Sequence, residues 1–63
     1  MTSIFIITFY NILTLTTEEF ELEFPSIAFD FVIDFAKELD LPDHRLIGVE
    51  QTDDPNNRWL NNQ

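Results

Sequence analysis

The sequence contains two regularly spaced rows of carboxylates, whose type and spacing could allow them to bind basic groups. One row alternates with apolar residues and the other recurs every fourth residue. The strand row is Glu19, Glu21 and Glu23, and the helix row is Asp30, Asp34 and Glu38. Alternate strand residues lie roughly 6–7 Å apart, and helix residues four apart lie about 6 Å apart. Both spacings resemble that of neighbouring phosphates, so the rows could occupy an Arg/Lys groove built for nucleic acid. The alternative is an ordinary solvated surface.

The sequence contains few residues that could form a catalytic site. The single histidine, His44, lies between Asp43 and Arg45 in an expected turn, where it is interpreted as a solvated surface residue. Nucleophilic catalysis needs a positioned base, and carboxylate acid/base catalysis needs two acids in different environments. The sequence has one glycine, too few for a phosphate-binding loop. We therefore expect a protein that is not an enzyme and that uses no cofactor.

A polar segment near the C-terminus is the one candidate metal site. Asp53 and Asp54, with Asn56 and Asn57, offer the oxygen ligands that calcium prefers. The segment lacks the alternating spacing and the glycine of a calcium loop, so a polar tail without metal is the favoured interpretation. The two aspartates are predicted to support partner binding.

Charge restricts the class of partner. The chain of 63 residues contains twelve acidic and three basic residues, which gives a net charge of −9. Such a chain repels nucleic acid and anionic lipid and attracts basic surfaces. Hydrophobic residues make up 44% of the chain, enough for a folded domain. The absence of cysteine and the polar interruptions of the uncharged segment 1–17 favour a cytoplasmic protein without a membrane span.

Four elements must position these residues. Residues 3–10 are apolar on both faces, which predicts a central strand, and residues 19–24 alternate strictly, which predicts a half-buried one. Residues 27–39 show helical spacing of Ala28, Phe31, Val32, Phe35, Ala36 and Leu39, with Ser26 as N-cap. Residues 45–51 are predicted to form a third strand and residues 52–63 a polar tail.

The segment 11–18 is ambiguous. Leu13 and Leu15 have the opposite phase to the apolar residues from Phe20 onward, so a bulge, bend or loop is expected near residues 16–18. A rival interpretation takes Thr16 and Glu19 as a capping box that starts a short helix. The clean later alternation favours the strand.

The predicted fold is therefore α+β, in the order ββαβ. A right-handed crossover gives a three-stranded antiparallel sheet of order 2-1-3 with the helix on one face. The other face would show Ile4, Ile6, Thr8 and Tyr10. Either Trp59 and Leu60 fold back over this face, or a partner covers it. A homodimer would associate there through Ile4, Ile6, Tyr10 and Trp59.

With EFELEF at 19–24 and the acidic helix DFVIDFAKEL at 30–39, the chain resembles, as a type, the small acidic anti-defence inhibitors of bacteriophages. These include DNA mimics and many anti-CRISPR proteins. The resemblance implies a stoichiometric inhibitor that binds the nucleic-acid channel or target-recognition surface of a CRISPR effector or another DNA-binding protein, in the cytoplasm of the host cell.

The leading hypothesis is accordingly a non-catalytic inhibitor whose carboxylates bind a basic nucleic-acid-binding protein. The binding residues would be the strand row, the helix row, Asp53 and Asp54. The second hypothesis is a structural dimer or complex subunit that associates through the apolar sheet face.

Overall fold

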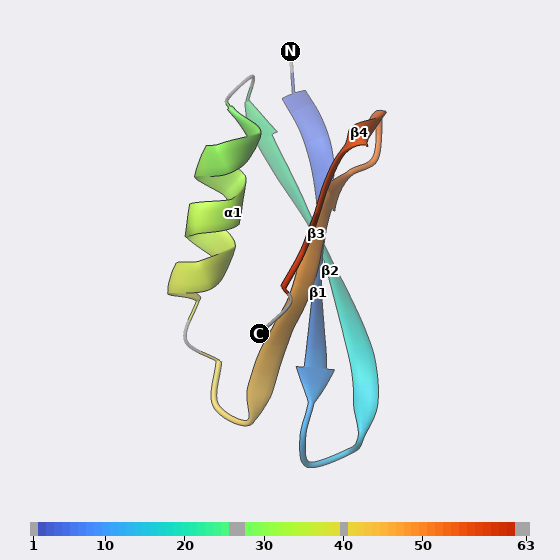
Figure 1. The fold of residues 1–63 in the computed structure, drawn as a ribbon, viewed down its shortest axis with the longest axis vertical. Coiled ribbons are helices and arrows are strands. Elements are labelled where there is room, and N and C mark those ends of the chain that lie inside the picture. Colours follow the sequence, from blue (N-terminus) through green and yellow to red (C-terminus); the bar gives the residue numbers. More distant parts are fainter. Residues whose placement is uncertain (1, 26–27, 40, 62–63) are drawn as a thin grey trace.

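The fold is an antiparallel sheet covered on one face by a helix (Figure 1). A computed structural model describes residues 2–25, 28–39 and 41–61. The elements are β1 (Thr2–Asn11), β2 (Thr16–Pro25), α1 (Phe29–Glu38), β3 (His44–Gln51) and β4 (Asp54–Leu60). The strand order is β2-β1-β3-β4, and every neighbouring pair is antiparallel. The α+β class, the antiparallel sheet and the central position of β1 agree with the sequence prediction.

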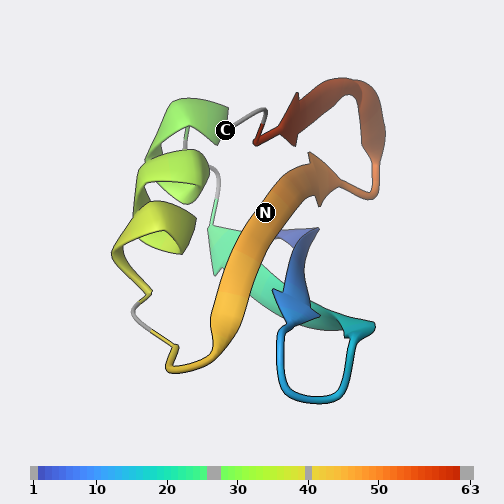
Figure 2. The same ribbon diagram turned by 60° about the horizontal axis from the view of Figure 1, so that its bottom comes forward.

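The prediction of three strands is wrong, because Asp54–Leu60 forms a fourth strand. This segment was expected to belong to a polar tail, since its Asn residues and Pro55 give it low strand propensity. It pairs with β3 through the neighbouring register positions Gly48↔Leu60 and Val49↔Trp59. Both views of the ribbon place β4 far from the β1–β2 turn (Figures 1 and 2).

The core lies between β1 and α1. Phe5, Ile7 and Phe9 alternate along β1 and are almost fully buried, as are Val32 and Ala36 of the helix and Val49 of β3. Aromatic rings extend the core sideways: Phe5 meets Phe24 of β2 edge-on, with ring centroids 5.7 Å apart. Burying a large apolar side chain stabilises a fold by about 1.5–3 kcal/mol, so these few residues carry much of the stability of so short a chain.

The helix begins and ends close to the predicted limits. Its first residue is Phe29 and Ala28 occupies the N-cap position without a side-chain cap; the predicted N-cap, Ser26, lies outside the described residues. Leu39 is extended, so the helix ends at Glu38, one residue before the predicted limit. Phe31, predicted to face the core, is 57% exposed. The buried stripe is centred on Val32 and Ala36, which turns Phe31 toward solvent.

A four-residue turn resolves the ambiguous segment. Residues 12–15 connect β1 to β2, and the register pairs Asn11 with Thr16. The Asn11 Oδ1 accepts hydrogen bonds from the Leu13 and Thr14 amides, at 3.0 and 3.3 Å. The phase change therefore falls before Thr16, rather than at 16–18. The rival short helix is wrong, because Thr16 starts β2.

The turn also carries backbone strain. Leu15 has φ of 59°, and its side chain is 70% exposed. An L-residue with a bulky side chain in this left-handed region is unfavourable by roughly 1–2 kcal/mol, whereas Asn visits it readily. No burial of the Leu15 side chain within the domain offsets this cost.

Gly48 permits the close approach of β4 to β3. A Cβ atom at this position would lie 2.7 Å from the backbone oxygen of Trp59. The register of β1 with β3 shifts at the same place, between Thr8 and Phe9. A side chain at Gly48 would thus push the last strand away from the sheet.

Gly48→Ala should lower the free energy of unfolding by about 1–3 kcal/mol, because the added methyl group meets a fixed backbone oxygen. Urea unfolding followed by circular dichroism measures the change. Asn56→Ala is the control, since it alters an exposed side chain of the same strand pair. Equal stability of Gly48→Ala and wild type would contradict the close approach of β4.

Leu15→Asn should raise the free energy of unfolding by about 1 kcal/mol, because Asn tolerates the left-handed backbone. Leu13→Asn is the matched control: Leu13 lies in the same turn and is 74% exposed, but its φ is not positive. It should change stability by less than about 0.5 kcal/mol. The same unfolding assay decides, and equal effects of both variants would argue against strain at Leu15.

Candidate protein-binding surface

The sheet face opposite α1, here called the open face, has no covering layer within the described part of the chain. Because Phe5, Ile7 and Phe9 face the helix, Ile4, Ile6, Thr8 and Tyr10 of β1 point the other way. Ile4 is 41% exposed, and the other three are half-buried. These four residues form the β1 stripe, and they lie where the sequence placed them.

The strand row lies directly beside the β1 stripe. The register pairs Ile4 with Glu23, Ile6 with Glu21 and Thr8 with Glu19, so these side chains share the open face. All three glutamates are exposed. Thr2 Oγ1 donates to Glu23 Oε2 at 3.1 Å. An ion pair in the described part of the chain joins His44 to Glu18, an acid that lies on the opposite face of β2.

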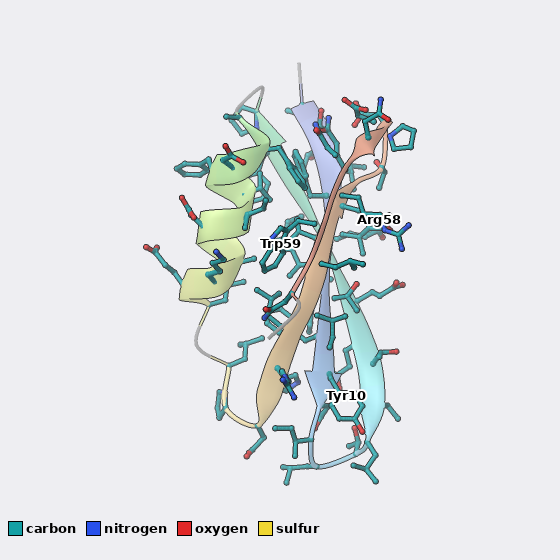
Figure 3. The ribbon with its side chains drawn as sticks, viewed as in Figure 1. Tyr10, Arg58 and Trp59 are labelled. Atoms are coloured by element: carbon teal, nitrogen blue, oxygen red, sulfur yellow. The ribbon has the colours of Figure 1, made fainter. Side chains whose placement is uncertain are left out.

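The opposite flank of the stripe comes from β3 and β4. Arg58 points away from the helix and Trp59 points toward it (Figure 3). Arg58 is the register partner of Glu50. A hollow of about 230 Å³ lies here, lined among others by Thr8, Glu19 and Arg58. The open face therefore has an apolar centre, a flank on β2 whose charged residues are all acidic, and a flank of mixed charge on β3 and β4.

Trp59 does not belong to the open face. It is half-buried against the core, and the Lys37 ammonium of α1 lies 5.2 Å from the centroid of its ring. The expectation that Trp59 covers the open face or joins a dimer there is therefore wrong. The reason is the register of β4: Trp59 pairs with Val49, whose side chain faces the helix. Leu60 points to the other face and is 52% exposed.

The helix row is exposed but lies elsewhere on the molecule. Asp30, Asp34 and Glu38 are solvent-exposed on α1, while Val32 and Ala36 turn inward to the core. The helix covers one face of the sheet (Figure 1). The register places the strand row on the other face. The structure does not bring the two rows together, so one flat partner surface could contact only one of them.

Asp53 and Asp54 lie at the β3–β4 connection and make local contacts. Asp53 accepts hydrogen bonds from Gln51 Nε2 at 2.9 Å and Ser3 Oγ at 3.2 Å. The bond from Gln51 contributes most to lowering the pKa of Asp53. Asp54 Oδ1 accepts from the Asn56 amide at 3.1 Å. Among the described residues no three carboxylate or imidazole groups gather as a metal site.

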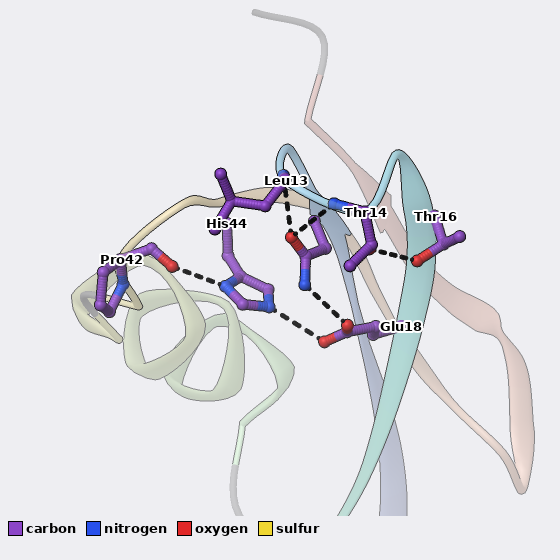
Figure 4. Close-up of polar contacts among 7 residues, drawn as sticks. Leu13, Thr14, Thr16, Glu18, Pro42 and His44 are labelled. Atoms are coloured by element: carbon purple, nitrogen blue, oxygen red, sulfur yellow. Dashed lines mark hydrogen bonds and ion pairs between the residues drawn. The ribbon is translucent and has the colours of Figure 1, made fainter.

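A polar network at the other end of the sheet joins three strands (Figure 4). His44 Nε2 lies 2.9 Å from Glu18 Oε1, and Nδ1 lies 2.8 Å from the Pro42 carbonyl oxygen. Asn11 Nδ2 donates to the second carboxylate oxygen of Glu18 at 3.0 Å. His44 is the first residue of β3, with only 19% of its side chain exposed. The interpretation of His44 as a solvated turn residue is therefore wrong.

The partners of His44 determine its protonation. A carbonyl oxygen and a carboxylate oxygen both accept hydrogen bonds, and in the imidazolium both ring nitrogens donate them. The geometry therefore fits the imidazolium. The hydrogen bond to Pro42 is the largest cause that raises the pKa of His44, followed by the bond to Glu18. The bonds from Asn11 and His44 lower the pKa of Glu18.

Sequence reasoning missed Glu18, although its position carried a signal. Glu18 has the same parity as Phe20, Leu22 and Phe24, so it points to the helix side of β2, unlike the three glutamates of the strand row. An acid placed on the apolar side of a strand needs a partner there. The register brings Asn11 and His44 to it from β1 and β3.

Comparison with family models, with curated proteins and with solved structures returns no match for this chain. The described helix has neither the length nor the apolar character that crossing a membrane requires.

The pKa of His44 should lie above its ordinary value of 6.5 and fall in Glu18→Gln. His44 is the only histidine, so an NMR titration of its ring protons is unambiguous. Glu19→Gln is the matched control, because this neighbouring acid lies on the opposite sheet face. An equal drop in both variants would contradict the specific Glu18–His44 contact.

The same pair should make stability depend on pH. The raised pKa of His44 contributes stability that is complete below 6.5 and is lost as pH rises through the folded value. The lowered pKa of Glu18 contributes stability that is present above 4.5 and is lost as pH falls through the folded value. The contribution of the pair to unfolding free energy should therefore be largest between 4.5 and 6.5.

Proposed function

We propose that this chain is a non-catalytic inhibitor that binds a basic surface of a nucleic-acid-binding protein, such as a CRISPR effector, and displaces nucleic acid from it. The open face is the binding surface. The strand row takes the place of phosphates, and the β1 stripe adds apolar contact. The protein acts in the host-cell cytoplasm, needs no cofactor and binds no nucleic acid itself.

One observation carries the proposal: three exposed carboxylates stand in register with an uncovered apolar stripe on the same sheet face. On a strand face with acids alone, water would solvate the carboxylates and no partner would be needed. Apolar side chains left open beside them favour a protein partner, because contiguous exposed apolar surface marks interaction sites. Exposed carboxylates favour a partner rich in Arg and Lys.

Net charge supports the same class of partner. With a charge of −9 the chain is attracted over a distance to basic surfaces and repelled from nucleic acid. Grooves that hold nucleic acid are strongly basic, and binding to them weakens steeply with salt. The helix row, on the far side of the molecule, strengthens this long-range attraction without direct contact in the complex.

A structural dimer is the second candidate, because the β1 stripe could also bury against a second copy. Ile4, Ile6 and Tyr10 would form the contact, without Trp59. A two-fold dimer through this face would, however, gather six strand-row glutamates around its interface, and like charges at close range oppose association. Ile6→Asp would dissociate such a dimer, which sedimentation of the wild type and the variant at micromolar concentration detects.

The triple variant Glu19→Lys, Glu21→Lys, Glu23→Lys should lose its partner. The wild type, captured with bacterial lysate at low salt, should retain a nucleic-acid-binding protein that high salt releases; mass spectrometry identifies it. With the purified partner, wild type should displace bound DNA or RNA in a fluorescence anisotropy assay. The triple variant should do so at least about tenfold more weakly, because each attractive contact becomes repulsive.

The matched control is Asp30→Lys, Asp34→Lys, Glu38→Lys, which makes the same change of charge on the opposite side of the molecule. If both triple variants compete equally weakly, net charge alone drives binding and the open face is not the site. A partner that retains its nucleic acid at saturating wild-type protein rules out displacement.

A further inference from the structure

The outer edge of β2 is an unpaired row of backbone groups. β2 is the terminal strand of the sheet and pairs only with β1. In the described part of the chain, none of the backbone hydrogen bonds that lie outside the helix and the strand ladders involves a β2 residue. Every second residue of a terminal strand directs its N–H and C=O groups away from the sheet. β2 thus offers about five such residues along its ten.

The opposite edge of the sheet is less suited to pairing. β4 has seven residues and contains Pro55 near its start. Its register with β3 is irregular between Glu50 and Gln51. Proline and irregular register are devices that close a sheet edge to further strands. In β2 the only proline is Pro25, the last residue, and the register of β2 with β1 is unbroken over its length. The two edges therefore differ, and β2 is the open one.

The side chains of β2 define what could pair with it. On the open face stand the exposed glutamates of the strand row. On the helix face stand Phe20, Leu22 and Phe24, which the helix covers incompletely: Phe20 is 41% exposed, and the other two are half-buried. A further strand would lie beside acids on one face and beside partly exposed apolar groups on the other. Its own residues would therefore alternate between basic and apolar.

A second copy of the chain does not meet this requirement. Two β2 strands paired edge to edge would place glutamates of one copy beside glutamates of the other on the open face. Like charges directly opposite each other destabilise a sheet, and each copy carries a charge of −9. The charge of the edge thus disfavours self-pairing and favours a basic strand.

We infer that β2 is a strand-addition site, at which a partner segment with alternating basic and apolar residues extends the sheet as a fifth strand. The inference deepens the proposed function, on which it rests for the role of the strand row. Main-chain hydrogen bonds supply affinity, and the alternating side chains supply specificity. The partner's basic residues meet Glu19, Glu21 and Glu23, and its apolar residues cover Phe20 and Leu22.

A synthetic peptide tests this inference without knowledge of the partner. The probe is a capped decapeptide of alternating Lys and Val, titrated at low salt into the intact protein labelled with ¹⁵N. Two further probes carry backbone N-methyl groups, one at every Lys and the other at every Val. In a strand of given direction all Lys amides point to one side, so only one of the two probes has its methyl groups against β2.

Strand addition predicts that one N-methylated peptide binds at least about tenfold more weakly than the unmodified peptide, because several main-chain hydrogen bonds are lost. The other should bind as the unmodified peptide does, and the identity of the blocked probe reports the direction of the added strand. Amide shifts and slowed hydrogen exchange should map to β2 and not to β4. The strand-row triple Lys variant should lose this binding, and the helix-row variant should retain it.

Other outcomes overturn the inference. Equal binding of both N-methylated probes, or of a peptide with the same composition in blocks, shows attraction to the acids without strand pairing. In that case the proposed function stands if the strand-row variant still fails to displace nucleic acid. No binding of the alternating peptide at low salt also rules out strand addition. The wild type could also form a dimer in sedimentation, with its β2 amides protected from exchange. That result would show that a second copy, and not a basic strand, pairs with β2.

Discussion

The packing of one face of β1 against α1 is the interaction on which the remaining structure depends. Phe5, Ile7 and Phe9 are nearly inaccessible to solvent, and they contact the helix through Val32 and Ala36. A chain this short can bury only one such layer. Once this face of the sheet is used, the alternation of side chains leaves the residues of the β1 stripe on the other face. The exposed apolar surface is thus a direct consequence of how the core is built.

The same constraint explains where the charges lie. The strand row alternates with Phe20, Leu22 and Phe24, so packing these apolar residues beside the core directs the glutamates to the open face. On α1, inward Val32 and Ala36 leave the helix row outside. A two-layer fold therefore separates the two rows by its own thickness. Their common acidity acts jointly at long range, but only one row can belong to a given contact surface.

Polar contacts fix the ends of this arrangement. At one end Glu18, His44 and Asn11 join three strands, and the amide of Ile12 donates to the Asp43 carbonyl oxygen at 2.9 Å. These bonds tie the β1–β2 turn to the connection between α1 and β3. At the other end Ser3, Gln51 and Asp53 bond to one another where β3 turns into β4. The sheet is held at both ends, and the outer edge of β2 is left open between them.

The amino-acid sequence by itself determined the elements with strong periodicity. The doubly apolar residues 3–10 specified a central strand, the alternation at 19–24 specified its acidic neighbour, and the spacing at 27–39 specified a helix, because each pattern encodes which side chains avoid water. From these followed the positions of the strand row, the helix row and the β1 stripe.

Only the tertiary structure decided what depends on contacts between distant segments. Asp54–Leu60 has weak strand propensity, and it becomes β4 because β3 presents a bonding edge and Gly48 leaves room for it. The same pairing turns Trp59 toward the helix. The register of three strands brings His44 to Glu18, which is 26 residues away in the chain, and Asn11 joins them from across the β1–β2 turn. The local alternation of β2 shows that Glu18 lies on the apolar side and needs a partner, but only the register of the paired strands determines which residues that partner group contains.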